Sequence, residues 1–331
     1  MGPLRFLCSH FTTWSECCLR ASMLPRRSED YRTLLWVFVF APLFVSLHYL
    51  RPGWGFILLP VSCYFAIAAG VIAHNHMHRP VLRSKWANEM LSAWISILYG
   101  YPVFAWLPTH NLNHHKLVNR RGDATITWRY TNEHNAWVAA TYFFVSAYFQ
   151  SAWIKDYIRE AKRDKPRVYR RIVVQYVVTY GAHAAALSLA LGLYGPRAGI
   201  QVWALSLGIP AFAALWTIML FNYIQHVHTD PWSLHNHSRN FEGRLLNILL
   251  FGNGYHTVHH EQASLHWADA ARAHARIRPL IDDRLCHGSM FAFFFRQYLL
   301  TPFWPELGTT QIGRAPFDDS VEPTVLNQSA I

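Results

Sequence analysis

The sequence is poor in cysteine, and its few cysteines follow no disulfide or metal-binding pattern. The five cysteines are an odd number and none forms a CxxC pair, so neither a disulfide framework nor a zinc site is indicated and reduced thiols are expected. Residues 1–30 contain charges and no apolar stretch long enough for a cleaved signal peptide. The opening "MGPLRF" also lacks the Ser or Thr of a myristoylation motif. This N-terminal segment therefore receives no function.

Charged residues are also scarce, and acidic ones are the scarcer kind. They make up 15% of the chain, with 19 Asp and Glu against 30 Lys and Arg and a net charge of +11. The basic residues lie beside apolar stretches instead of forming a separate domain, so membrane topology explains them better than binding to nucleic acid, and no nucleic-acid partner is expected. Crossing about 30 Å of hydrocarbon takes about 20 helical residues. Uncharged stretches near this length lie at 33–50, 52–73, 90–109, 135–154, 172–196 and 198–225.

The basic residues between these stretches predict their orientation. Residues 155–171 hold eight basic residues, whereas the connections at 51–53 and 195–198 hold one Arg each. By the positive-inside rule, the first is a cytoplasmic loop and the two short connections lie on the opposite side of the membrane. The first two and the last two apolar stretches then form membrane-spanning hairpins, and the N-terminal segment is cytosolic.

The two middle stretches are predicted to lie at the membrane interface. Gly100 and two prolines interrupt the first, which favours a re-entrant or interfacial segment, and the Tyr and Trp residues of 135–154 suit an interfacial helix. The sequence therefore predicts an all-α, multi-pass integral membrane protein with about four transmembrane helices, interfacial helices and a cytosolic histidine-rich cap. Residues 31–285 are assigned to this membrane domain and 286–331 to a C-terminal cytosolic tail.

Histidine, in contrast, is abundant, with 20 residues. Nine of them lie in four clusters, "HNHMH", "HNLNHH", "NYIQH" and "HTVHH", which the predicted topology brings to the cytoplasmic face: His74, His78, His110, His114, His115, His226, His256, His259 and His260. Residues four apart share a helix face, so His74 and His78 can point at one metal, as can His110 and His114. Adjacent His114 and His115 point about 100° apart and can serve two metals.

The chemistry of the clusters favours transition metals. Imidazole suits iron, zinc, copper or nickel, whereas magnesium and calcium need oxygen ligands, for which no matching set of carboxylates is present. Two ions with four or five ligands each would use all nine histidines. A ligating imidazole usually donates its other N–H to an acceptor, and Asp123, Asp230 and Glu261 are candidates by proximity in the sequence. The interleaved histidines are not expected to be ligands: His76, His228, His235, His237 and His266.

In these motifs the sequence resembles the integral-membrane fatty acid desaturase and hydroxylase superfamily. "HNHMH" resembles the first histidine box as HxxxH, "HNLNHH" the second as HxxxHH and "HTVHH" the third as HxxHH, over about residues 35–265. The resemblance implies four spans and a non-haem di-iron centre, with two iron ions as cofactor and O2 as co-substrate. "NYIQH" resembles an additional element before the third box, which implies that Asn222, four residues ahead of His226, contacts an iron directly or through water.

The resemblance implies a desaturase that introduces a double bond into a fatty acyl chain, using O2 and two external electrons. The substrate is then an acyl lipid, acyl-CoA or acyl carrier protein conjugate within membrane lipids. No haem or flavin module is recognisable, so a separate electron donor of the ferredoxin or cytochrome b5 type is expected. Residues 155–171 are a candidate docking segment for an acidic partner or anionic headgroups.

The sequence alone leaves other functions open. The second box and "NYIQH" also resemble elements of membrane alkane monooxygenases, so a hydroxylase or ketolase of an alkane, acyl chain or carotenoid is the second hypothesis, and histidine spacing does not separate the two. A metal transporter would need ionisable ligands inside the helix bundle, whereas these clusters lie at predicted helix ends. A purely structural membrane protein would leave nine aligned histidines without a purpose.

Overall fold

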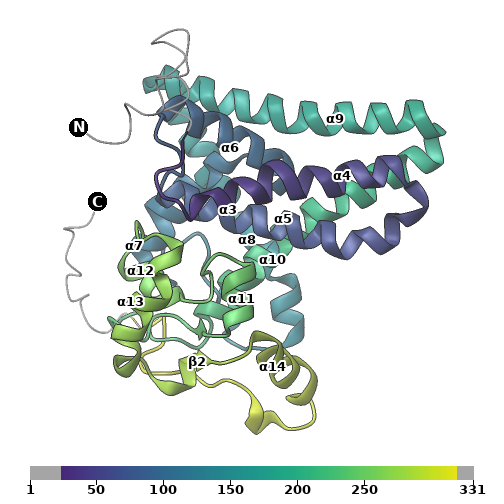
Figure 1. The fold of residues 1–331 in the computed structure, drawn as a ribbon. Coiled ribbons are helices and arrows are strands. Elements are labelled where there is room, and N and C mark those ends of the chain that lie inside the picture. Colours follow the sequence, from purple (N-terminus) through teal and green to yellow (C-terminus); the bar gives the residue numbers. More distant parts are fainter. Residues whose placement is uncertain (1–23, 319–331) are drawn as a thin grey trace. The chain divides into compact units, whose positions relative to one another are not determined.

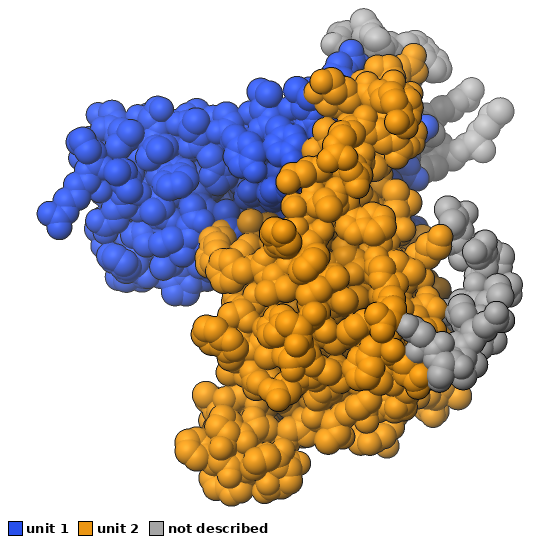
Figure 2. Space-filling view, turned by 180° about the vertical axis from the view of Figure 1, so that it is seen from behind, with its two compact units in different colours: residues 1–103, 170–211 blue, residues 104–169, 212–331 orange. Residues whose placement is uncertain are grey.

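In the computed structural model, residues 24–318 are described, so Cys8, Cys17 and Cys18 lie outside the described part. The described chain is almost entirely helical, with one parallel pair of two-residue strands, β1 (Asn240–Phe241) and β2 (Cys286–His287). This confirms the predicted all-α membrane fold. The chain divides into two compact units, which Figure 2 colours separately. Unit 1 comprises the residues up to 103 and residues 170–211, and unit 2 comprises residues 104–169 and those from 212 onward.

Unit 1 begins with the first predicted hairpin. α3 (Asp30–Leu35), η2 (Trp36–Phe40) and α4 (Ala41–Leu50) run on as one apolar stretch of 21 residues. A single turn, η3 (Pro52–Trp54), leads into α5 (Gly55–His78). The two arms are joined by hydrogen bonds from Trp36 to the Tyr64 hydroxyl at 2.9 Å and between His48 Nε2 and Ser62 Oγ at 2.9 Å. The Pro and Gly at 52–53 therefore form the turn that the sequence predicts.

The third apolar stretch is interrupted, as its glycine and prolines predict. α6 (Lys85–Tyr99) ends at Gly100, whose φ of +84° lies in the left-handed region, and a short helix η4 (Val103–Ala105) follows. A Cβ added at Gly100 would lie 2.3 Å from the Cβ of Ala211. Both the backbone conformation and the close approach therefore require glycine at this position.

The last two apolar stretches form α9 (Pro166–Trp203), η6 (Ala204–Gly208) and α10 (Ile209–His226), a helical run of 61 residues. The run breaks at Gly195, with φ 74° and ψ 176°, where the sequence predicts a turn. One crossing takes about 20 residues, so the run is far longer than one crossing needs. By length and composition, the described chain has three membrane-spanning candidates, or up to four if the interrupted segment from Lys85 to Leu117 counts as one.

The predicted basic loop at 155–171 is wrong, because this segment is helical. α8 (Ala136–Asp164) continues through most of it, and only Lys165 leaves the helical conformation before α9 starts at Pro166. Its Lys, Arg, Glu and Ala residues are strong helix formers. Ion pairs between Arg159 and Asp156, three residues apart, and between Lys165 and Glu160 add support along the surface. Charge marks the membrane side of a segment, but it does not distinguish a loop from a helix.

Unit 2 carries most of the histidine clusters on short elements. The second cluster lies on η5 (Leu107–His114) and α7 (His115–Leu117), and the third predicted box is α12 (His256–Glu261). α12 packs on α13 (Ala270–Ile277), and these two helices and β2 are labelled along one side of the unit in Figure 1. The remaining described elements of this unit are α11 (Arg244–Leu249), η7 (Trp267–Asp269), η8 (Arg278–Leu280), η9 (Asp283–Leu285), α14 (Met290–Phe294), η10 (Phe295–Leu300) and η11 (Pro305–Leu307).

Candidate metal centre

Four histidines of unit 2 converge with one ring nitrogen each, and we call them the four-histidine group: His114, His226, His256 and His260. The Nε2 atom of His226 lies 3.1 Å from that of His114, 2.9 Å from that of His256 and 3.2 Å from that of His260. The Nε2 atoms of His256 and His260 are 3.1 Å apart. His114 and His226 are completely buried. Residues more than a hundred positions apart in the sequence therefore bring their Nε2 atoms together.

The outer contacts of two of these rings fix where their protons lie. His114 Nδ1 is 2.7 Å from a carboxylate oxygen of Asp123, and His226 Nδ1 is 3.1 Å from the carbonyl oxygen of His237. Carboxylate and carbonyl oxygens only accept, so each Nδ1 carries a proton and the inward-facing Nε2 is the nitrogen that a metal ion could take. Four rings present their Nε2 atoms to one another at 2.9–3.2 Å. This donor set fits a bound transition-metal ion.

A second convergence in the same unit is the three-histidine group, His110, His115 and His259. The Nε2 atom of His115 lies 3.0 Å from that of His110 and 3.0 Å from that of His259. His74 and His78 belong to unit 1, where they lie one turn apart near the end of α5 with ring centroids 5.0 Å apart. Adjacent His114 and His115 serve different groups, as their helical spacing predicts.

His110 was expected to point at the same metal as His114. In the structure its ring nitrogen lies in the same group as that of His115 instead. η5 is a π-helix, and the backbone N–H of His115 bonds the carbonyl of His110, five residues earlier. The wider turn therefore brings positions five apart onto one face. α12 has ordinary α-helical geometry, and there His256 and His260, four residues apart, fall in the same group.

Asp123 makes the predicted contact with a ligand candidate. Its buried carboxylate accepts from the Nδ1 of His114, from the backbone N–H of Asn119 at 2.7 Å, and from both the backbone N–H and the hydroxyl of Thr125. Burial by itself raises the pKa of this carboxyl, but the His114 imidazole and the donated hydrogen bonds outweigh it and lower the pKa to about 2. Asp123 is therefore a carboxylate at physiological pH and holds His114 in one tautomer.

The same expectation is wrong for Asp230 and Glu261. Glu261 accepts a hydrogen bond from Nδ1 of His235 at 2.8 Å, and Asp230 accepts from the backbone N–H of Trp232 in a local turn. Glu261 follows His260 directly on a helix, so its side chain points about 100° away from that ring. A position next to a histidine in the sequence does not determine where the side chain of Asp230 or Glu261 points.

The interleaved histidines have other partners. His76 Nε2 contacts the carbonyl of Asn88 and the hydroxyl of Ser92, and His228 Nε2 donates to the carbonyl of Asn132 at 2.6 Å. Neither belongs to a convergent group among the described residues.

Asn222 was named from the sequence, but its partner Tyr142 and the buried Arg239 carry no signal there. The amide nitrogen of Asn222 donates to the hydroxyl of Tyr142 at 2.8 Å and to the carbonyl of Thr125 at 3.3 Å. Arg239 is fully buried, and its guanidinium donates to the carbonyls of Ile224 and Val227, on either side of His226. These carbonyls form the C-terminal end of α10, where a positive charge is favourable. Only the fold reveals that Arg239 holds the end of this helix.

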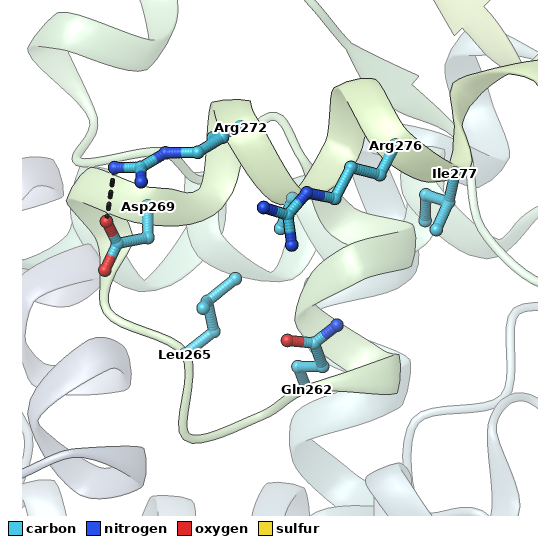
Figure 3. A pocket seen from close by; sticks show the side chains of 7 residues that line it. Gln262, Leu265, Asp269, Arg272, Arg276 and Ile277 are labelled. Carbon is cyan, nitrogen blue, oxygen red and sulfur yellow. Dashed lines mark hydrogen bonds and ion pairs between the residues drawn. The ribbon is translucent and has the colours of Figure 1, made fainter.

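A pocket of about 310 Å³ lies beside α13, as shown in Figure 3. Its labelled lining residues are Gln262, Leu265, Asp269, Arg272, Arg276 and Ile277. Arg272 is paired with Asp269 at 3.2 Å, and Arg276 lies one turn further along the helix. Two guanidinium groups and a carboxylate make a poor surface for a hydrocarbon chain, so this pocket does not have the character of an acyl channel.

Comparison with known proteins agrees with the geometry. The family model described as fatty acid desaturase matches residues 50–291, a range that includes all nine clustered histidines. The chain therefore belongs to the fatty acid desaturase family. With three to four apolar helical stretches, it is an integral membrane protein with an activity of the desaturase or hydroxylase type, an oxidoreductase acting on fatty acids. No significant match was found among curated proteins or among solved structures.

Proposed function

We propose that this protein is a membrane-bound di-iron desaturase, which introduces a double bond into a fatty acyl chain using O2 and two external electrons. The observation that carries the proposal is the convergence of four ring nitrogens in the four-histidine group, with the Nε2 atoms of His114 and His226 3.1 Å apart. Membership of the fatty acid desaturase family supports iron over the other metals that imidazole binds.

The proposed ligands follow the two groups. His114, His226, His256 and His260 are proposed to hold one iron and the three-histidine group to bind the other, and His74 and His78 of unit 1 are proposed as further iron ligands. Asn222 is proposed to contact an iron directly or through water. Its amide nitrogen is committed to Tyr142 and Thr125, so its carbonyl oxygen would be the contacting atom.

Residues of the chain itself orient the histidine rings and exclude water from this site before any reaction takes place. When bound, the iron pair supplies the activation of O2 and the removal of hydrogen from an unactivated methylene. Asp123 and the His237 carbonyl each hold one proton on the outer nitrogen of a ring, which leaves the inner nitrogen free to bind. The complete burial of His114 and His226 excludes water from that side of the centre.

We further propose that the protein crosses the membrane several times with its metal centre facing the cytoplasm. The substrate is an acyl lipid, acyl-CoA or acyl carrier protein conjugate, and the electrons come from a separate donor of the ferredoxin or cytochrome b5 type. The eight basic residues of the helical segment 155–171 support a cytoplasmic position and offer a surface for an acidic partner or anionic headgroups.

The ligand assignment is tested by single histidine variants. His115→Ala and His260→Ala each remove a ligand, so we expect both to lose activity and bound iron while expression stays close to wild type. His235→Ala is the matched control, because His235 is also half-buried in unit 2 but bonds to Glu261. Iron per protein, measured on the purified variants, decides: unchanged iron in His115→Ala and His260→Ala would refute the assignment.

The reaction is tested by product analysis in a host that lacks its own desaturase. A lipid product lighter by two hydrogen atoms supports desaturation. A product heavier by one oxygen atom supports instead the alternative, a di-iron hydroxylase or ketolase of an alkane, acyl chain or carotenoid. Transport of zinc across liposomes by a purified protein that holds no iron would overturn the enzyme proposal altogether.

A further inference from the structure

A third set of metal-binding side chains lies in unit 2, outside both histidine groups. One ligand atom each from Glu242, His274 and Cys286 lies within 4.8 Å of the others. Glu242 directly follows β1, Cys286 is the first residue of β2, and His274 lies on α13. No spacing rule points to this set, because its members are far apart in the sequence and no second cysteine accompanies Cys286.

The backbone places these side chains together. The two strands pair in parallel, with Asn240 opposite Cys286, and the N–H of Glu242 donates to the carbonyl of His287 at 2.8 Å. Nε2 of His274 donates to a carboxylate oxygen of Glu242 at 2.8 Å. The ring of His274 is buried, while Glu242 and Cys286 are half-buried. The site is thus held by three separate segments and stays open to solvent on one side.

We propose that Glu242, His274 and Cys286 form a third metal site, which takes a single divalent cation of the zinc class with solvent completing the coordination. A thiolate, an imidazole and a carboxylate are all ligands of zinc, and three protein ligands with an open fourth position are a common arrangement. The proposal does not depend on the desaturase activity, since it shares no residue with the iron ligands.

The competing interpretation is an ordinary ion-pair network. Nε of Arg278 donates to the same oxygen of Glu242 at 2.8 Å, and its Nη2 pairs with Asp283 at 2.8 Å. A carboxylate has two oxygens with about four lone-pair positions, so Glu242 can accept from Arg278 and still bind a metal. In an ion-pair network the thiol of Cys286 would only hydrogen-bond to the Glu242 carboxylate, whereas a metal site uses the sulfur as a ligand.

Two further observations bear on Cys286. It packs against the core cluster of Ile281, Leu285 and Ile312, which fixes the position of its sulfur. Burial and the neighbouring Glu242 carboxylate raise the pKa of its thiol to about 12.

A metal at this position would have a structural consequence. It would join β1, β2 and α13, and α13 packs on α12, which carries the third histidine box. Each strand is only two residues long and the core cluster beside them is small. A metal that binds only the folded arrangement adds its binding free energy to folding, as in small zinc-stabilised domains.

Cobalt is the probe that tests the site. The full-length protein is stripped with a chelator and titrated with Co²⁺, which produces a thiolate-to-cobalt charge-transfer band only where a cysteine binds. We expect the band in wild type and its loss in Cys286→Ser, with cobalt affinity at this site weakened on the order of tenfold or more. Cys63→Ser, which changes the other half-buried cysteine of the described chain, and a triple serine variant of Cys8, Cys17 and Cys18 should keep the band.

Two more variants separate the interpretations. Arg278→Gln removes the competing positive charge, so we expect several-fold tighter Co²⁺ binding, whereas a pure ion-pair network predicts a less stable protein with no gain in binding. His114→Ala disrupts the four-histidine group but should keep the thiolate band, so this proposal and the di-iron proposal can fail independently. Absence of the band in wild type, its persistence in Cys286→Ser, or weaker binding in Arg278→Gln would overturn the proposal.

Discussion

At the scale of single residues, the protons on the outer nitrogens determine what the histidines can do. Asp123 and the carbonyl of His237 hold one proton each on the outer nitrogens of His114 and His226, so the inner nitrogens are the ones available to a metal. An imidazole held in the other tautomer would carry its proton on Nε2. That nitrogen would then have no lone pair with which to bind a metal ion. The carboxylate of Asp123 is therefore a positioning group whose loss should appear first in metal retention.

Asp123→Asn tests this role. The amide can present either its oxygen or its N–H to His114, so the ring is no longer confined to one tautomer, and we expect iron affinity to fall about 10–100-fold. The measurement is iron retained per protein during dialysis against a graded series of chelator concentrations. Asp230→Asn is the control, because Asp230 bonds a backbone N–H in a local turn and should leave retention unchanged; equal retention in both variants would contradict the role of Asp123.

Much of this site was predictable from the sequence, and the rest depended on directions that spacing does not encode. The nine histidines stood out because they lie in dense clusters, several of them at helical intervals, and Asp123 follows the second cluster after eight residues. Asp230 and Glu261 lie even closer to a cluster, but their side chains bond to a turn and to His235. The cluster around Cys286 was missed because its members meet only through strand pairing and helix packing.

At the scale of elements, one widened helical turn sets the arrangement of the second cluster. η5 bonds residues five apart, which moves His110 from the face of His114 to the face of His115. A periodicity of 3.6 residues is the default assumption for a helix, and nothing in the letters "HNLNHH" indicates the exception. The helical ends, in contrast, were predicted where glycine and proline lie, at 52–53, Gly100 and Gly195.

Gly100→Ala tests the break after α6. The new methyl group must adopt a positive φ and would lie 2.3 Å from the Cβ of Ala211, so we expect the free energy of unfolding to fall by about 2 kcal/mol or more. Thermal unfolding of the detergent-solubilised protein measures the change. Gly53→Ala is the matched control, since a Cβ at Gly53 meets no atom within 4 Å and should shift stability by less than about 1 kcal/mol. Similar unfolding temperatures for both variants would show that α6 tolerates a side chain at its end.

At the scale of the whole molecule, the four-histidine group joins the second cluster, the end of α10 and the third box. Each of these lies in unit 2, although residues 170–211 of unit 1 intervene in the chain. The sequence predicts apolar helices and their order because these depend on local composition. The division into two interleaved units was not predicted, since contacts between distant segments leave no local pattern.

Removal of the metal tests this linkage. Iron that binds only the folded chain stabilises it in proportion to the logarithm of its concentration, by about 2.7 kcal/mol at a hundredfold excess over the dissociation constant. We therefore expect chelation to lower the unfolding temperature of the solubilised protein and added Fe²⁺ to restore it. The double variant His114→Ala/His260→Ala should lose less stability on chelation than the wild type, because its four-histidine group no longer holds iron. A wild-type protein that is insensitive to chelation would show that the clusters do not hold the unit together.

The span of the four-histidine group also restricts how the protein is made. Its first member is His114 and its last is His260, so the group cannot be complete until the third box has been synthesised and has folded against the second cluster. A chain truncated before His260 would therefore retain the second cluster and His226 but lack the fourth ring nitrogen of the group.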